Sequence, residues 1–139
     1  MANPGPASAT TNHPQSLATN QALRLLASYQ SANIAATGDT VLPVLNTGRY
    51  SVKNVVVTNA SADISGASVG LFTASGGNGT AIVSNAALTG VTGSTVVSER
   101  TVASTAAATG QNLYFRVGTA ASSGTADVFV YGYDLTFLP

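Results

Sequence analysis

Few residues of this chain could do chemistry, and they are scattered. The only histidine, His13, lies in a proline-rich stretch near the start of the sequence. A general base works only when its neighbours hold it in place, and an extended stretch of this kind does not. The chain has no cysteine, which removes thiol nucleophiles and thiolate metal ligands. We therefore expect no cofactor and no metal.

The carboxylates suggest no active site either. No two of them lie close in sequence: they are Asp39, Asp63, Glu99, Asp127 and Asp134. A catalytic pair could still meet in space. The simpler interpretation places Asp39 and Asp63 in turns, where Asp caps the backbone. Glu99 and Arg100 are interpreted as an exposed neutral pair or a contact between subunits.

The glycine-rich segment 76–79 resembles a phosphate-binding loop only superficially. Such a loop needs a following lysine with serine or threonine, and Thr80 and Ala81 follow here instead. Together these observations predict a protein that is not an enzyme and has no small-molecule substrate.

The charge and hydropathy of the chain limit the kinds of partner that it is expected to bind. Charged residues make up 7% of the chain, where about 25% is typical, and the formal net charge is zero. A neutral chain has no long-range attraction for nucleic acid or an anionic membrane. No segment approaches the roughly 20 apolar residues that span a bilayer. Zero net charge also removes the repulsion that keeps copies apart, so self-association is expected.

Residues 1–20 are expected to form an extended N-terminal arm. Prolines resist helix and sheet, and three of the five prolines of the chain fall in this stretch. An arm bound to a partner and a frayed terminus without a role both fit this composition. If the arm binds, the residues expected to make contact are Asn3, Pro4, Pro6, His13, Pro14 and Leu17.

Residues 21–139 are expected to form one β-sandwich domain. Short runs that alternate between apolar and polar residues are separated by Gly-, Ser- and Thr-rich turns, which is typical of antiparallel sheets. About eight strands in two sheets would give a jelly-roll-like sandwich. The expected strands are 24–36 with a bulge, 40–45, 49–59, 67–74, 80–84, 95–103 with an interruption at 98–100, 111–118 and 126–137, and 86–91 is a weak strand or a turn.

The last expected strand is apolar on both faces. Val128 and Val130 alternate with a row of aromatic residues, so only one of the two sets can face the core. The other set needs a second cover, and a neighbouring subunit is the simplest one. The sequence therefore predicts a subunit interface made by Phe129, Tyr131, Tyr133 and Phe137.

Residues from about 32 to 137 resemble small structural proteins of tailed bacteriophages. The resemblance rests on three strand-and-turn segments: 34–39 (IAATGD), 55–60 (VVVTNA) and 69–74 (VGLFTA) with its glycine-rich turn. It continues in 113–118 (LYFRVG) and 126–132 (ADVFVYG). The chain is most similar to capsid decoration, or cement, proteins, including those of cyanophages.

This resemblance implies a homotrimer that binds the major capsid protein on the outer surface of the virion shell and stabilises it. The arm would then be the part that contacts the capsid. An alternative is a head-fibre, tail or adhesin-like component of the virion that binds carbohydrate. That alternative needs an exposed aromatic platform, for which Tyr50, Tyr114, Tyr131 and Tyr133 are the candidates.

Overall fold

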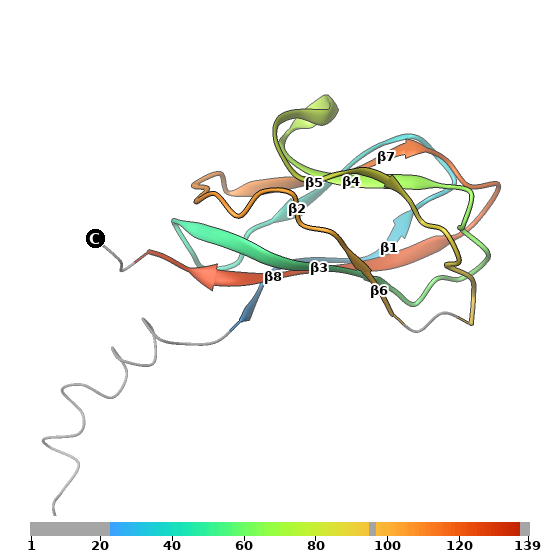
Figure 1. The fold of residues 1–139 in the computed structure, drawn as a ribbon, viewed down its shortest axis with the longest axis horizontal. Coiled ribbons are helices and arrows are strands. Elements are labelled where there is room, and N and C mark those ends of the chain that lie inside the picture. Colours follow the sequence, from blue (N-terminus) through green and yellow to red (C-terminus); the bar gives the residue numbers. More distant parts are fainter. Residues whose placement is uncertain (1–22, 95–96, 137–139) are drawn as a thin grey trace, which may run out of the picture.

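A computed structural model describes residues 23–94 and 97–136, and these residues form an all-β sandwich (Figure 1). The expected arm, residues 1–20, and Phe137 lie outside the described residues. A three-residue 3-10 turn, η1 (Ser75–Gly77), accompanies the strands of the described part. These strands are β1 (Arg24–Asn33), β2 (Gly38–Pro43), β3 (Tyr50–Thr58), β4 (Ser68–Ala74), β5 (Asn78–Ala87), β6 (Val97–Arg100), β7 (Asn112–Thr119) and β8 (Thr125–Asp134).

The strands form two four-stranded antiparallel sheets. Sheet A has the order β1-β8-β3-β6, and sheet B has the order β2-β7-β4-β5. The first strand pairs with the last, the second with the seventh, the third with the sixth and the fourth with the fifth. Further pairing of β3 with β8 joins the two strand pairs of sheet A, and pairing of β4 with β7 joins those of sheet B. This nested connectivity is that of a jelly roll, which confirms the expected fold class.

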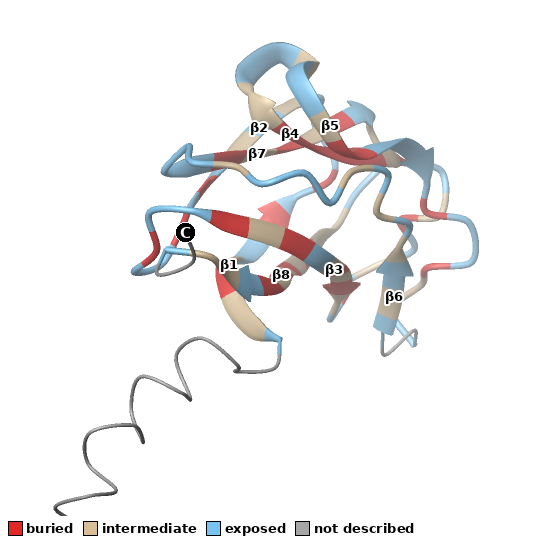
Figure 2. Cartoon of the chain, turned by 60° about the vertical axis from the view of Figure 1, so that its left-hand side comes forward, coloured by how far each residue is buried: buried red, intermediate tan, exposed pale blue. Residues whose placement is uncertain are grey.

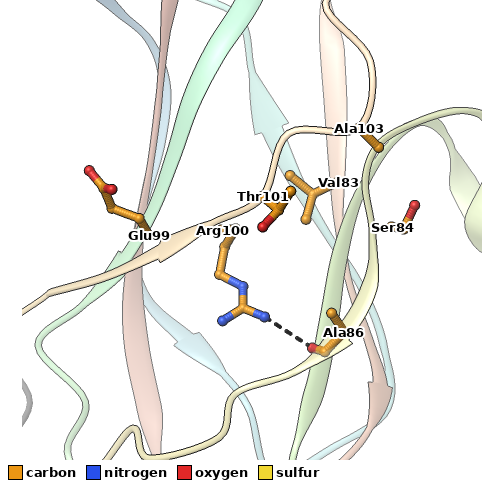
Figure 3. A pocket seen from close by; sticks show the side chains of 7 residues that line it. All are labelled: Val83, Ser84, Ala86, Glu99, Arg100, Thr101 and Ala103. Carbon is orange, nitrogen blue, oxygen red and sulfur yellow. Dashed lines mark hydrogen bonds between the residues drawn. The ribbon is translucent and has the colours of Figure 1, made fainter.

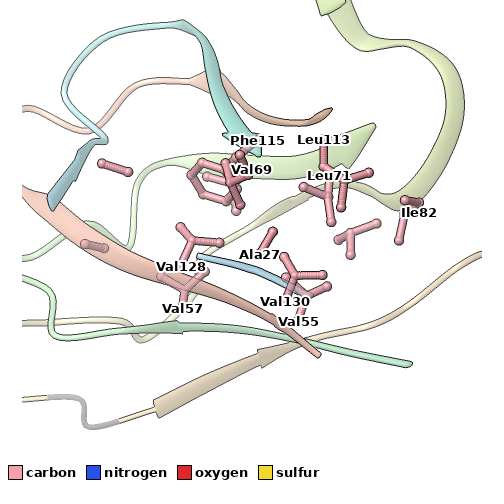
Figure 4. Packing of buried hydrophobic residues seen from close by; sticks show 14 of the residues in the cluster. Ala27, Val55, Val57, Val69, Leu71, Ile82, Leu113, Phe115, Val128 and Val130 are labelled. Carbon is pink, nitrogen blue, oxygen red and sulfur yellow. The ribbon is translucent and has the colours of Figure 1, made fainter. Parts of the chain in front are cut away.

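The core lies between the two sheets and is built from alternate residues of each strand. Val55, Val57, Val128 and Val130 from sheet A meet Leu71, Leu113 and Phe115 from sheet B, and all are at most 1% exposed (Figure 4). β-Branched and aromatic side chains suit these positions because they pack well on a pleated surface.

The first strand contains the bulge that its sequence suggested, and the bulge changes which residues are inside. Leu25 lies opposite Tyr131, but two residues later Ala27 lies opposite Val130. Leu26 and Ala27 are both buried, whereas Leu25 is only partly covered. The bulge adds one residue to β1, so the consecutive residues Leu26 and Ala27 both face the core, which strict alternation along a strand would not allow.

Pro43 and residues 98–100 show how local sequence relates to the edges of the sheets. Pro43 ends β2, an edge strand of sheet B, as expected for a residue without a backbone donor. The expected interruption at 98–100 was wrong, because these residues form most of β6 and pair with 55–57 of β3. Two adjacent charges suggested a break, but a short edge strand accommodates one charge on each face.

Candidate interaction surface

The outward face of β8 carries a row of aromatic side chains. Ala126, Val128 and Val130 are fully buried, so Phe129, Tyr131 and Tyr133 project from the opposite face of sheet A. The rings of Phe129 and Tyr131 stack with their centroids 6.5 Å apart and their planes at 27°. Phe129 and Tyr131 are half-buried, and Tyr133 is 40% exposed. Figure 2 shows the alternation of buried and partly buried residues along this sheet.

Neighbouring strands widen this row into a patch. Leu25 of β1 lies opposite Tyr131, and Val56 of β3 lies opposite Phe129. Directly opposed residues share a face of the sheet, so both side chains join the aromatic row. We call the five residues Leu25, Val56, Phe129, Tyr131 and Tyr133 the sheet A patch; none of them is charged.

Polar groups at the rim of the patch are held by bonds within the chain. The carboxylate of Asp127 accepts hydrogen bonds from the backbone N–H of Ser31 at 2.7 Å and from Nδ2 of Asn59 at 3.1 Å. Glu99 Oε1 accepts a longer bond, 3.4 Å, from Nδ2 of Asn54. An uncharged centre with a polar rim is the usual composition of a protein–protein interface.

Comparisons with protein families, curated proteins and solved structures found no match to this chain.

The structure brings together three of the four residues expected at the subunit interface. Phe129, Tyr131 and Tyr133 share one face, and Phe137 lies outside the described residues. The arm residues expected to bind a partner, from Asn3 to Leu17, also lie outside. Leu25 and Val56 were missed, although the run Val55-Val56-Val57 carried a signal, because alternation turns its middle residue away from its neighbours.

One of the four tyrosines expected to form an exposed carbohydrate platform is not exposed. Tyr50 is fully buried, its hydroxyl donates to the carbonyl oxygen of Gly110 at 2.7 Å, and burial raises its pKa. Tyr114 is half-buried and alternates with the buried residues of β7, so it lies on the outer face of sheet B. Only Tyr131 and Tyr133 share a face, together with Phe129.

Three of the carboxylates each have their own partner in the folded chain. Asp39 pairs with Arg116 at 2.9 Å, and Asp134 pairs with Arg24 at 3.0 Å. The exposed carboxylate of Asp63 accepts bonds from the backbone and hydroxyl of Ser65, which lower its pKa. Within residues 23–94 and 97–136, no three His, Cys, Asp or Glu residues cluster as a metal site would require.

Glu99 and Arg100 do not form the neutral pair that their sequence suggested. Glu99 lies opposite Val56 on the outer face, and Arg100 lies opposite the buried Val55 on the inner side. Alternation along β6 therefore separates the two charges.

The helical content of the described part is limited to η1, and no helix there has the length and apolarity to cross a membrane.

Proposed function

We propose that this chain is a structural protein of a tailed-phage virion, a decoration protein that stands on the outer surface of the head. In this proposal it forms a homotrimer through the sheet A patch and binds the major capsid protein. It does no chemistry on a small molecule. The sequence resemblance suggests this function, and the sheet A patch supplies the surface that self-association needs.

The observation that carries the proposal is the stacked pair Phe129 and Tyr131 within an uncharged patch. Aromatic side chains bury a large area with few rotatable bonds, and their contacts dominate the energetics of many interfaces. None of the five residues of the patch is charged, so burial of their side chains carries no penalty for desolvating a charge.

A decoration protein stabilises a shell by mass action. A protein that binds the assembled lattice and not the free subunits shifts the equilibrium toward the lattice. Three copies in one trimer each add a weak contact, and the second and third contacts form at a high effective concentration. Trimerisation therefore raises the occupancy of the shell without any strong contact by one subunit.

The row Phe129, Tyr131 and Tyr133 also favours a second candidate, a carbohydrate-binding component of a head fibre or tail. Aromatic residues at every second position of one strand present their rings along a single face. Such a row can stack on the apolar faces of successive sugar rings. In this candidate the patch must stay exposed in the assembled virion.

Binding to shells that lack the protein separates these two functions. We expect the full chain to saturate such shells and to copurify with heads, and Tyr131→Lys to bind at least tenfold more weakly because it fails to trimerise. The matched control is Val41→Lys, on an edge strand of the other sheet, which should bind normally. Copurification with tails, or binding to a panel of polysaccharides that Tyr131→Lys abolishes, would replace the decoration function by the second candidate.

A further inference from the structure

A second feature lies where an edge strand of each sheet faces the other: a cavity of about 310 Å³ opens between β5 of sheet B and β6 of sheet A. Seven residues line it: Val83, Ser84, Ala86, Glu99, Arg100, Thr101 and Ala103 (Figure 3). Most of the lining side chains are small. In Figure 3 the guanidinium of Arg100 points into the space between the strands, and the carboxylate of Glu99 points away from it.

The guanidinium of Arg100 is only partly satisfied. Its Nη2 donates to the carbonyl oxygens of Ala87 at 2.8 Å and of Ala86 at 3.4 Å. Its Nη1 makes one long bond, 3.3 Å, to Oγ of Ser98. Its Nε is buried and has no partner among the described residues. Burial lowers the pKa of this guanidinium, which means that the surroundings disfavour its charge.

No carboxylate side chain of this chain compensates that charge. All five carboxylates fall within the described residues, and each is engaged elsewhere. Asp134 and Asp39 pair with Arg24 and Arg116. The remaining three, Asp63, Asp127 and Glu99, accept bonds from Ser65, from Ser31 and Asn59, and from Asn54 respectively. A carboxylate side chain that reaches Arg100 must therefore come from another molecule.

We propose that this cavity binds the side chain of a glutamate or aspartate carried by a partner protein. A carboxylate matches the planar donors of a guanidinium better than any other protein group. The buried Val83 and the methyl group of Ala103 offer apolar contact to the methylene stem of such a side chain. A small inorganic anion has no stem to use that contact. This site lies on the inner side of β6, whereas the sheet A patch lies on the outer face of sheet A, and Glu99 stands between the two. Carboxylate recognition by Arg100 does not require the proposed trimer.

The test is a titration of the isotope-labelled full chain, followed by NMR, with two blocked tripeptides. One is acetyl-Ser-Glu-Ser amide, and the other has glutamine in place of glutamate. We expect the glutamate peptide to shift the backbone amides of Ser84, Ala86 and Ala103 and the Nε–H of Arg100. We expect it to bind about tenfold or more tightly than the glutamine peptide, as a charge-assisted hydrogen bond requires.

Two controls make the result decisive. Arg100→Gln should abolish the shifts, and sodium acetate at the same concentration should produce smaller ones because acetate lacks most of the stem. Equal binding of the two peptides, binding that survives in Arg100→Gln, or acetate binding as tightly as the peptide would overturn the proposal.

A pair of gain-of-charge variants tests the site without removing Arg100. Ala86 lines the cavity, and Ala87, its neighbour on β5, does not. Ala86→Glu places a tethered carboxylate beside Arg100, so it should raise the melting temperature and block the glutamate peptide. Ala87→Glu adds the same charge one residue away and should do neither. If both variants behave alike, the cavity does not recognise a carboxylate.

Discussion

The guanidinium Nη1 of Arg24 lies 3.0 Å from Oδ2 of Asp134, although the two residues are separated by 110 positions in the sequence. Arg24 begins the first strand and Asp134 ends the last, so this ion pair closes one end of sheet A. The other carboxylate oxygen of Asp134 accepts bonds of 2.6 Å from the hydroxyls of Thr47 and Thr136. The ion pair therefore lies within a network that joins the β2–β3 connection to both terminal strands.

This network predicts a loss of stability in acid. Burial alone would raise the pKa of Asp134, but the hydrogen bonds from Thr136 and Thr47 and the charge of Arg24 outweigh it and lower the pKa. The folded chain then binds this proton less readily than the unfolded chain. The free energy of unfolding should fall as the pH drops below about 5, and it should be fully retained at neutral pH. Urea unfolding at a series of pH values measures this slope.

The variant Asp134→Asn tests whether Asp134 causes this pH dependence of the free energy of unfolding. It should lower the free energy of unfolding at pH 7 by about 1–3 kcal/mol, because Thr47 and Arg24 lose a charged acceptor. It should also flatten the pH dependence. Asp63→Asn is the comparison variant, because Asp63 is exposed and accepts its hydrogen bonds from Ser65, two residues away, rather than from a network that joins strands. An unchanged slope in Asp134→Asn would show that the network does not contribute to stability in acid.

Gly132 is expected to be intolerant of any side chain. It lies on the inner face of β8, where a Cβ would overlap the carbonyl oxygen of Ser51 and lie 2.7 Å from Cδ1 of Leu26. Gly132→Ala should therefore destabilise the sandwich by about 1–3 kcal/mol, the usual penalty for overpacking. Gly66→Ala is a matched control, since a Cβ there meets nothing within 4 Å. Thermal unfolding of the two variants side by side tests this; equal melting temperatures would contradict the packing around Gly132.

Deletion of residues 1–20 should leave the fold of the sandwich intact but weaken the binding of the protein to the capsid. Every strand of the described sandwich begins at Arg24 or later, so the melting temperature should change little. If the arm binds the capsid, the same deletion should strongly lower the occupancy of shells that lack the protein, measured against concentration. Shells that bind both forms equally well would show that the arm does not anchor the protein.

The sequence predicted the all-β sandwich because alternation with a period of two survives in most of its strands. It predicted the aromatic row of β8 for the same reason. It could not place the bulge after Leu25, because a bulge changes which side chains point to each face of the sheet without changing the composition of the strand. Nor could it show which group satisfies the hydroxyl of Tyr50, since its acceptor is the carbonyl oxygen of Gly110, 60 residues away. The Arg100 cavity was likewise unpredictable, because it lies between strands of different sheets.

The mass of the protein in solution tests the central claim, self-association through the sheet A patch, most directly. Light scattering at micromolar concentration should give the mass of a trimer for the full chain, near three times 13.8 kDa. Tyr131→Lys and Tyr133→Lys should give monomers, because each would bury an unpaired charge in the interface.

Val41→Lys is the matched control, because Val41 is 44% exposed on the opposite sheet and Tyr133 is 40% exposed. This variant should remain a trimer. A monomeric full chain, or a trimer that survives lysine at both Tyr131 and Tyr133, would contradict the account.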